Sequence, residues 1–409
     1  MTTLAILLPH PYRGGTLESL KSLARMFQHG SALRGRELRI VVCPPAGAYD
    51  VGREFASLLE AGIAVRPCRW QRVSARQARA AWRRHGRGNF PDRHADYALP
   101  LEGDGPLLEA DFWFVVSDRV GWPLLPLRPY GAMVFDYIQR YAHEGFTDEE
   151  FAVQARAWNP FVREARFVAV TTPGTANDLN SYVGVPRGRI VQVPMFLPQI
   201  PRPDDSRPIP EDYFLWVTNS NPHKNQHRVL QALESYYAAG GALETVMAGP
   251  YTHSFRPDTL DPTTDASPAV LAIRRTIRQS PALRQHLHIA GELSAADYAS
   301  AIRHARFLLH AVLYDNGTFS VIDAARLGTA ALSSRYPAME FINERFRLNL
   351  AFFDPFNPAD LAAALRRMET DAGTTRAALP DPAFFDRFDW KSLAGEFIDA
   401  LAGHLEAPA

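Results

Sequence analysis

Residues 314–329 read YDNGTFSVIDAARLGT, and this stretch decides the fold of the second half of the chain. The run before it, residues 306–313 (RFLLHAVL), is apolar and has the length of a buried parallel strand. The apolar run after it predicts a helix that ends at Gly328. The polar residues between the two predict a turn: Asn316, Gly317 and Thr318. We therefore expect a strand, a turn and a helix.

Two carboxylates stand eight positions apart in this stretch, Asp315 in the predicted turn and Asp323 in the first turns of the predicted helix. Ligands of open α/β sheets bind outside the carboxyl ends of the strands. Free N–H groups at a helix start hold phosphate, and carboxylates accept hydrogen bonds from sugar hydroxyls. The alternative is a helix-capping acid followed by an unrelated surface acid. The spacing alone leaves both interpretations open.

The composition is that of an ordinary folded protein with about two or three domains, since the chain has 409 residues, 46% of them hydrophobic and 22% charged. Lysine plus arginine equals aspartate plus glutamate at 44 each, so no overall charge favours a nucleic-acid partner. The two cysteines, Cys43 and Cys68, are too few for a disulfide framework and are typical of core residues in a reducing compartment. No signal peptide and no membrane-spanning run is evident, so we expect a cytoplasmic location.

Apolar runs that alternate with helical stretches predict parallel sheets and an α/β fold. In the first half the expected strands are 4–8, 38–43, 64–67, 112–116, 132–135, 167–171 and 190–193. In the second half they are 214–217, 245–248, 287–290, 306–313, 330–333 and 350–353. Residues 194–213 contain six prolines, which break the pattern and predict a linker. Two such domains would enclose a cleft, a preferred site for small ligands.

In this order and spacing the motifs resemble the retaining GT-B-fold glycosyltransferases of family 4. That family carries an acid-x7-Glu signature followed by a small-residue helix and a Gly-Thr-Pro turn. In this chain Asp315 to Asp323 and then Gly328-Thr329 resemble it. The resemblance implies two Rossmann-like βαβ domains facing across a cleft. It implies an acceptor-side domain at 1–198, a linker at 199–212, a nucleotide-sugar domain at 213–387, and a C-terminal helix at about 388–409 that packs back on the first domain.

The resemblance also implies a donor site. Lys224, in the segment YFLWVTNSNPHKN, falls on the family lysine that holds the donor diphosphate. Asp323 would bind the ribose hydroxyls and Asp315 the hydroxyls of the transferred sugar. The implied catalytic residues are Asp315, Lys224 and Asp136. The implied donor-binding residues are Gly14, Gly15, Asn219, Lys224, Leu293, Asn316, Gly317, Thr318, Phe319, Ser320 and Asp323. His10 and Arg13, which flank the glycine pair, are candidates for contacting the acceptor or a phosphate.

The chain departs from the family pattern at several of these positions. Asp315 and Asp323 stand where the family usually has glutamate, and Asn219 stands where many members have arginine. Asp136 is preceded by Phe135 where the family has histidine. We therefore keep two hypotheses of function, an active retaining hexosyltransferase and a non-catalytic binding subunit of the same fold.

Similarity to bacterial mannosyltransferases of surface-polysaccharide synthesis implies GDP-mannose as the donor, with a rhamnosyl or other hexosyl donor carried by UDP, TDP or GDP as the alternative. A saccharide or a lipid-linked saccharide would be the acceptor. No cofactor and no metal are expected, because no DxD motif stands out and no GxGxxG motif supports a nicotinamide.

An arginine-rich stretch runs from Arg66 to Arg93. Within it Arg72, Arg76, Arg79 and Arg83 recur at helical spacing and predict one cationic helix face. Such a face can contact a lipid diphosphate or an anionic membrane from the cytoplasmic side. The alternative is a solvated helix face with no partner.

Overall fold

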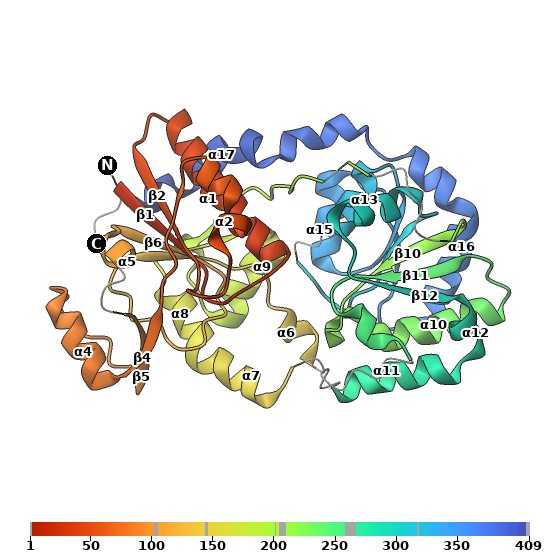
Figure 1. The fold of residues 1–409 in the computed structure, drawn as a ribbon, viewed down its shortest axis with the longest axis horizontal. Helices are drawn as coiled ribbons and strands as arrows, with labels where there is room; N and C mark the ends of the chain where they lie inside the picture. The colour runs from red at the N-terminus through yellow and green to blue at the C-terminus, as the bar shows by residue number, and fades with distance from the viewer. Residues whose placement is uncertain are drawn as a thin grey trace. The chain divides into compact units, whose positions relative to one another are not determined.

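The computed structural model describes residues 2–101, 105–143, 146–200, 202–203, 210–257, 267–316 and 319–405. Its contacts divide the chain into two compact units, each built on a parallel sheet with helices (Figure 1). The first unit comprises Met1–Asp136, Thr147–Pro198 and Arg387–Ala409. The second comprises Tyr137–Phe146 and Gln199–Asp386, so a short segment from within the predicted first domain belongs to the second unit.

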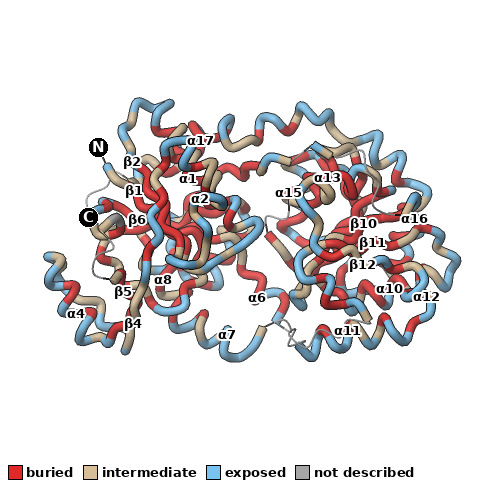
Figure 2. The backbone as a smooth tube through the Cα atoms, viewed as in Figure 1, coloured by how far each residue is buried: buried red, intermediate tan, exposed pale blue. Residues whose placement is uncertain are grey.

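The first unit has a seven-stranded sheet in the order β3-β2-β1-β6-β7-β8-β9, and every pairing in it is parallel. Its strands are β1 (Thr2–Leu7), β2 (Leu38–Cys43), β3 (Ala64–Val65), β6 (Phe112–Val116), β7 (Tyr130–Met133), β8 (Phe167–Val170) and β9 (Ile190–Gln192). The apolar runs of the sequence become the buried centre of this sheet (Figure 2). Both cysteines are buried free thiols, as predicted, Cys43 at the end of β2 and Cys68 in the segment after β3.

An antiparallel pair lies outside this sheet and was not predicted. Strand β4 (Trp70–Ser74) pairs with β5 (Asp96–Pro100), and α4 (Ala75–Arg84) lies between them in sequence. Helix α4 begins at a capping box, in which Ser74 accepts the backbone N–H of Gln77 and the Gln77 side chain bonds back. Arg72 therefore lies on β4 and not on the helix, which corrects the predicted four-arginine helix face.

The remaining helices of the first unit are α1 (Gly15–Leu33), α2 (Val51–Glu54), α3 (Ala56–Glu60), α5 (Gly105–Glu109), α7 (Asp148–Val153), α8 (Asn159–Glu164), α9 (Pro173–Asp178) and α17 (Trp390–Leu405). Two π-helical turns, Gln154–Trp158 and Leu179–Val183, and a 3-10 turn, Arg187–Arg189, complete it. The C-terminal helix α17 packs along α1, with the rings of Phe27 and Phe397 4.9 Å apart.

The second unit has a six-stranded parallel sheet in the order β12-β11-β10-β13-β14-β15. Its strands are β10 (Tyr213–Val217), β11 (Glu244–Ala248), β12 (Leu287–Gly291), β13 (Leu308–His310), β14 (Ala331–Ser334) and β15 (Ala351–Phe353). Counted within the unit this order is 3-2-1-4-5-6, which places the topological switch point between β10 and β13. Strand β13 is shorter than the predicted 306–313, because only its middle residues pair with both neighbours.

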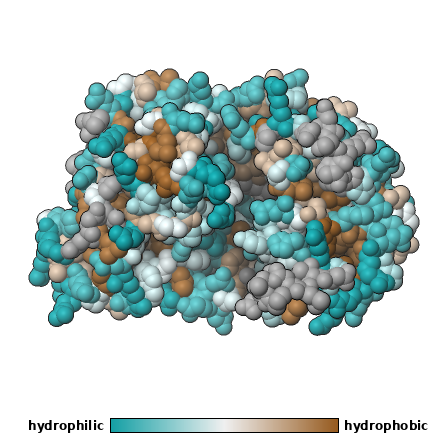
Figure 3. All heavy atoms as spheres, in the orientation of Figure 1, coloured by the Kyte–Doolittle hydropathy of each residue, from teal (hydrophilic) through white to brown (hydrophobic). Residues whose placement is uncertain are grey.

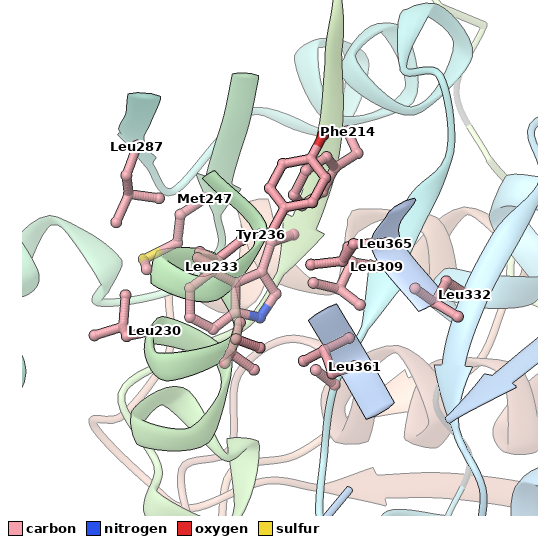
Figure 4. Packing of buried hydrophobic residues seen from close by; sticks show 14 of the residues in the cluster. Phe214, Leu230, Leu233, Tyr236, Met247, Leu287, Leu309, Leu332, Leu361 and Leu365 are labelled. Carbon is pink, nitrogen blue, oxygen red and sulfur yellow. The ribbon is translucent and has the colours of Figure 1, made fainter. Parts of the chain in front are cut away.

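The helices of the second unit are α6 (Ile138–Tyr141), α10 (Gln226–Ala238), α11 (Pro268–Gln279), α12 (Pro281–His286), α13 (Ala295–His304), α14 (Ser320–Arg326), α15 (Pro337–Phe346) and α16 (Pro358–Ala377). There are 3-10 turns at Pro222–Lys224 and Thr252–Phe255, and a third, Pro382–Phe388, leads into the last segment of the first unit. Side chains of α10 and α16 fill the core against the strands (Figure 4). The contributing residues include Leu233 and Tyr236 from α10, Leu361 and Leu365 from α16, and Phe214 from β10.

The face of the molecule drawn in Figure 3 is mostly hydrophilic, with apolar side chains in small groups. Within the described residues no helix is long and apolar enough to cross a membrane.

Candidate functional site

The carboxyl ends of β10 and β13 are neighbours in the second sheet, and the loop after each carries one member of an ion pair. Nζ of Lys224 lies 2.5 Å from Oδ2 of Asp315. Each of the two side chains is only 14% exposed. The loops are also joined by their backbones, since the N–H of Leu313 donates to the carbonyl of His223 at 2.9 Å. The structure thus brings together two of the three predicted catalytic residues.

Asp315 is held in its ionised form. Burial by itself raises the pKa of this carboxyl, but Lys224 and then His223 outweigh burial and bring the pKa down to about 2. The second carboxylate oxygen, Oδ1, accepts the backbone N–H of Asn316 at 2.8 Å. Asn316 itself is buried, next to the carboxylate that it helps to stabilise.

His310, at the end of β13, joins this site although the sequence did not predict it. It is 1% exposed, and Nδ1 lies 3.1 Å from Oγ of Ser333 on β14. Burial, and then the positive charge of Lys224, lower the pKa of His310 to about 3, so the ring is neutral near pH 7. Its Nε2 atom has no hydrogen-bond partner in the part of the chain that the structure describes. A histidine inside the apolar run RFLLHAVL was the only signal in the sequence.

Asp323 is a second buried carboxyl, on α14 as predicted. Burial raises its pKa to about 7, and Arg326, with Nη1 3.9 Å from Oδ1, opposes the rise only in part. Oδ1 of Asp323 and Oγ of Ser320 are both buried and have no hydrogen-bond partner among the described residues. Buried polar atoms without a hydrogen bond are rare in folded proteins. Both oxygens can accept hydrogen bonds from the hydroxyl groups of a ligand.

The other predicted donor-binding residues of this unit lie in loops at the carboxyl ends of strands. Asn219 follows β10, and its Oδ1 accepts the N–H of Asn221 at 2.9 Å. Leu293 is half-buried between β12 and α13, and Phe319 is the N-cap residue of α14. Gly317 and Thr318 lie outside the described residues.

In the first unit the predicted glycine pair lies between β1 and α1. Gly14 has φ 64°, a backbone conformation that favours glycine, and a Cβ added to Gly14 or Gly15 would meet no atom within 4 Å. The loop is therefore open to an approaching group. His10, in the same loop, lines a cavity of about 230 Å³ together with Trp70 and Trp122. Arg13 is exposed beside the glycines.

Asp136, the third predicted catalytic residue, takes part in a partly buried ionic cluster that the sequence did not predict. Its Oδ1 lies 3.2 Å from Nη2 of Arg119, whose guanidinium lies 5.0 Å from the centre of the Trp158 ring. Burial raises the pKa of the neighbouring Asp118 to about 6, against the opposing charge of Arg119. Ser117, just before it, has φ 111°, which is strained for a residue with a side chain. Its Oγ lies 2.9 Å from the hydroxyl of Tyr12 in the β1–α1 loop.

The arginine-rich stretch is less cationic than its composition suggests. Arg72 pairs with Asp96 at 2.6 Å, Arg79 pairs with Asp92, and Arg93 pairs with Glu164 at 2.6 Å. Arg76 and Arg83 remain exposed on α4. Three of the cations are thus locally neutralised, which weakens the predicted cationic face.

No family model matches the chain, and no curated protein matches it in sequence. Solved structures match along its whole length. HepE of Anabaena in complex with UDP and glucose gives a TM-score of 0.65 at 12% identity, covering 98% of this chain and 100% of HepE. Sucrose-phosphate synthase of Thermosynechococcus elongatus gives 0.64 at 15% identity, covering 99% of each chain. TarM gives 0.60 at 9% identity, covering 100% of this chain and 99% of TarM. The likeness shows that the chain has the GT-B fold, as predicted.

Proposed function

We propose that this protein is a glycosyltransferase that takes its sugar from a nucleoside-diphosphate donor. The observation that carries the proposal is the Lys224–Asp315 pair at the switch point between β10 and β13, followed in the chain by helix α14 with the buried Asp323. Ligands of doubly wound sheets bind at such a switch point. The fold supports it, since HepE, which the chain resembles, was solved with UDP and glucose.

Each charged group has a role that its environment supports. Lys224 supplies positive charge to the departing diphosphate, and charge stabilisation of this kind is usually the largest catalytic term. Asp315 keeps that ammonium in place and accepts hydrogen bonds from hydroxyls of the transferred sugar. Oδ1 of Asp323, which has no hydrogen-bond partner among the described residues, accepts hydrogen bonds from the ribose hydroxyls. The backbone N–H groups of Phe319 and Ser320, at the start of α14, face the diphosphate.

In the proposed reaction the bond between C1 of the sugar and the diphosphate oxygen breaks. A bond from an acceptor hydroxyl oxygen to C1 forms on the same face, so the anomeric configuration is retained. The hydroxyl proton passes to the departing phosphate oxygen. No protein nucleophile is required, which agrees with an Asp315 that is already paired with Lys224.

GDP-mannose is the donor that we propose from the sequence resemblance. UDP, TDP or other GDP sugars are the alternatives, and the HepE complexes give UDP particular weight. The acceptor is a saccharide or a lipid-linked saccharide of bacterial surface polysaccharide. The loop that contains His10 and Arg13 contacts it. Its apolar part suits the cavity that His10 and the two tryptophans line. A peripheral contact with the cytoplasmic membrane face through Arg66–Arg93 belongs to the same proposal.

Isothermal titration with UDP, GDP and TDP tests the nucleotide, and transfer is then measured with the sugar donors of the nucleotide that binds. Lys224→Ala should weaken nucleotide binding and Asp323→Asn should remove the ribose contact, each by about tenfold or more. Lys391→Ala, an exposed lysine on α17, is the control. If none of the three nucleotides binds, the transferase proposal is rejected and the non-catalytic binding subunit is favoured.

A further inference from the structure

A second cavity lies in the second unit, at the carboxyl ends of β13, β14 and β15. Its volume is about 240 Å³, and we call it the aromatic pocket. Neither Lys224 nor Asp315 lines it. Its walls include Leu313, Pro337 and Pro355 together with four aromatic rings and two charged side chains: Tyr141, Tyr314, Tyr336, Phe356, Arg335 and Asp354.

The aromatic rings form one wall of the pocket. Tyr141, from α6, stacks on Tyr314 with centroids 3.9 Å apart and planes 12° apart, and Tyr336 lies 5.3 Å from Tyr314. Tyr314 and Tyr336 are buried, whereas Tyr141 is 38% exposed and Phe356 is 58% exposed. Two neighbouring aromatic side chains open to solvent around a cavity indicate a binding surface more than a packing core.

The charged side chains keep hydrogen-bonding capacity. Arg335 places Nη1 3.0 Å from Oε1 of Glu340, which uses only part of its five N–H donors. Oδ1 of Asp354 accepts the backbone N–H of Phe356 at 2.9 Å. Oδ2 of Asp354 has no hydrogen bond to any described residue. The pocket therefore offers donors from a guanidinium and acceptors from a carboxylate beside aromatic faces.

We propose that the aromatic pocket binds one pyranose ring of a saccharide. The C–H face of a sugar packs on aromatic rings, while its hydroxyls accept from Arg335 and donate to Asp354. An alkyl chain would displace water from the guanidinium and the carboxylate without offering hydrogen bonds in return, which costs free energy. The volume lies below the ~300–1,000 Å³ of drug-sized sites, so it fits a single ring.

The pocket shares a wall with the Lys224–Asp315 pair. Tyr314 directly precedes Asp315, and Nδ2 of Asn225, which follows Lys224, donates to the carbonyl of Pro355 at 2.7 Å. A sugar in the pocket is thus a neighbour of the transferred sugar, as a unit of the acceptor would be. This assignment to the acceptor rests on the proposed function, whereas saccharide binding itself does not.

Saturation-transfer NMR with methyl α-D-mannopyranoside and methyl α-D-glucopyranoside tests the pocket. We expect binding of at least one glycoside to weaken by about two- to tenfold in Tyr141→Ala and Phe356→Ala, the effect of losing one stacking partner. Asp354→Asn, which keeps the side-chain size, should weaken it as well. Tyr182→Ala is the matched control, because Tyr182 is also 38% exposed but belongs to the first unit.

Glycoside binding that is equal in all variants, no glycoside binding to the wild type, or preferential binding of free uridine or guanosine at these residues would each overturn the proposal. Titration of UDP and GDP into the same proteins separates it from the proposed function. Glycoside binding without nucleotide binding would leave the pocket standing and reject the transferase. Nucleotide binding without glycoside binding would do the reverse.

Discussion

Lys224 and Asp315 are 91 residues apart in sequence, yet their side chains form a 2.5 Å ion pair that is largely shielded from water. Desolvating two charges costs about as much as their attraction returns, so such a pair is seldom kept for stability alone. The pair lies at the ends of two adjacent strands, and Asp323 lies on the helix that follows. This position suits the binding of a charged ligand. Mutations of this pair can therefore separate its effect on the free energy of unfolding from its effect on ligand binding.

Lys224→Met should lower the free energy of unfolding by about 3 kcal/mol, because it leaves the Asp315 carboxylate buried without its cation. The double variant Lys224→Met with Asp315→Leu should lose less, since no charge is then left alone. Urea denaturation measures both, and Lys391→Met is the control. Equal stabilities for the single and double variants would contradict the view that the pair is held against a desolvation cost.

Asp315 also predicts a loss of stability in acid. Its pKa is about 2 in the folded chain and about 3.9 in an unfolded chain. A lowered carboxyl pKa stabilises the folded state above the unfolded value, and that contribution disappears as the pH falls from about 4 to about 2. Asp315→Asn should lack this part of the acid transition, which denaturation at a series of pH values detects.

Asp323 predicts the opposite dependence, because its pKa is raised to about 7 in the folded chain. Between about pH 4 and pH 7 the folded state holds a proton that the unfolded state has lost, so the free energy of unfolding falls as the pH rises through this window. From pH 5 to pH 8 the wild type should therefore lose more stability than Asp323→Asn, by on the order of 1–3 kcal/mol. Thermal denaturation of both proteins at the two pH values measures the difference. A parallel decline in both would show that Asp323 is ionised throughout.

The strand before Asp315 and the helix after it could be predicted from sequence because apolar runs are local features. The ends of β13 could not, since they depend on which residues pair with β10 and β14. Lys224 could be placed at a strand end, but its contact with Asp315 requires β10 and β13 to be adjacent. That adjacency follows from the strand order of the whole sheet.

His310 and Arg119 show what the sequence hides. His310 lies in an apolar run. Its burial, and then the charge of Lys224, give the ring its low pKa, and Ser333 gives it a hydrogen-bond partner. Arg119 meets Asp136 because β6 and β7 pair in parallel and end together. Arg72 was assigned to a helix by its spacing, but the capping box at Ser74 starts the helix after it.

Asp136→Asn distinguishes a structural from a catalytic role for this residue. Arg119 is half-buried, and Asp136 is one of the two carboxyls whose charges hold the pKa of Arg119 high against the effect of burial. We expect a loss of about 2 kcal/mol in the free energy of unfolding, because a half-buried cation loses one partner. Asp92→Asn, at the exposed pair with Arg79, should cost less than about 1 kcal/mol. Unchanged stability together with lost sugar transfer would instead assign Asp136 to catalysis.

Gly30 lies where α1 packs closely against α17, so a larger residue there should destabilise the fold. A Cβ at this position would lie 2.2 Å from the backbone carbonyl oxygen of Ala394 and 2.5 Å from a side-chain carbon of Ile398. Backbone cannot yield as a side-chain tip can, so Gly30→Ala should force the helices apart and cost about 1–3 kcal/mol. The control is Gly373→Ala in α16, where a Cβ meets no atom within 4 Å and where alanine should stabilise the helix by up to about 1 kcal/mol. Urea denaturation of the two variants should therefore give shifts of opposite sign, and a Gly30→Ala protein as stable as the wild type would show that α17 is not closely packed on α1.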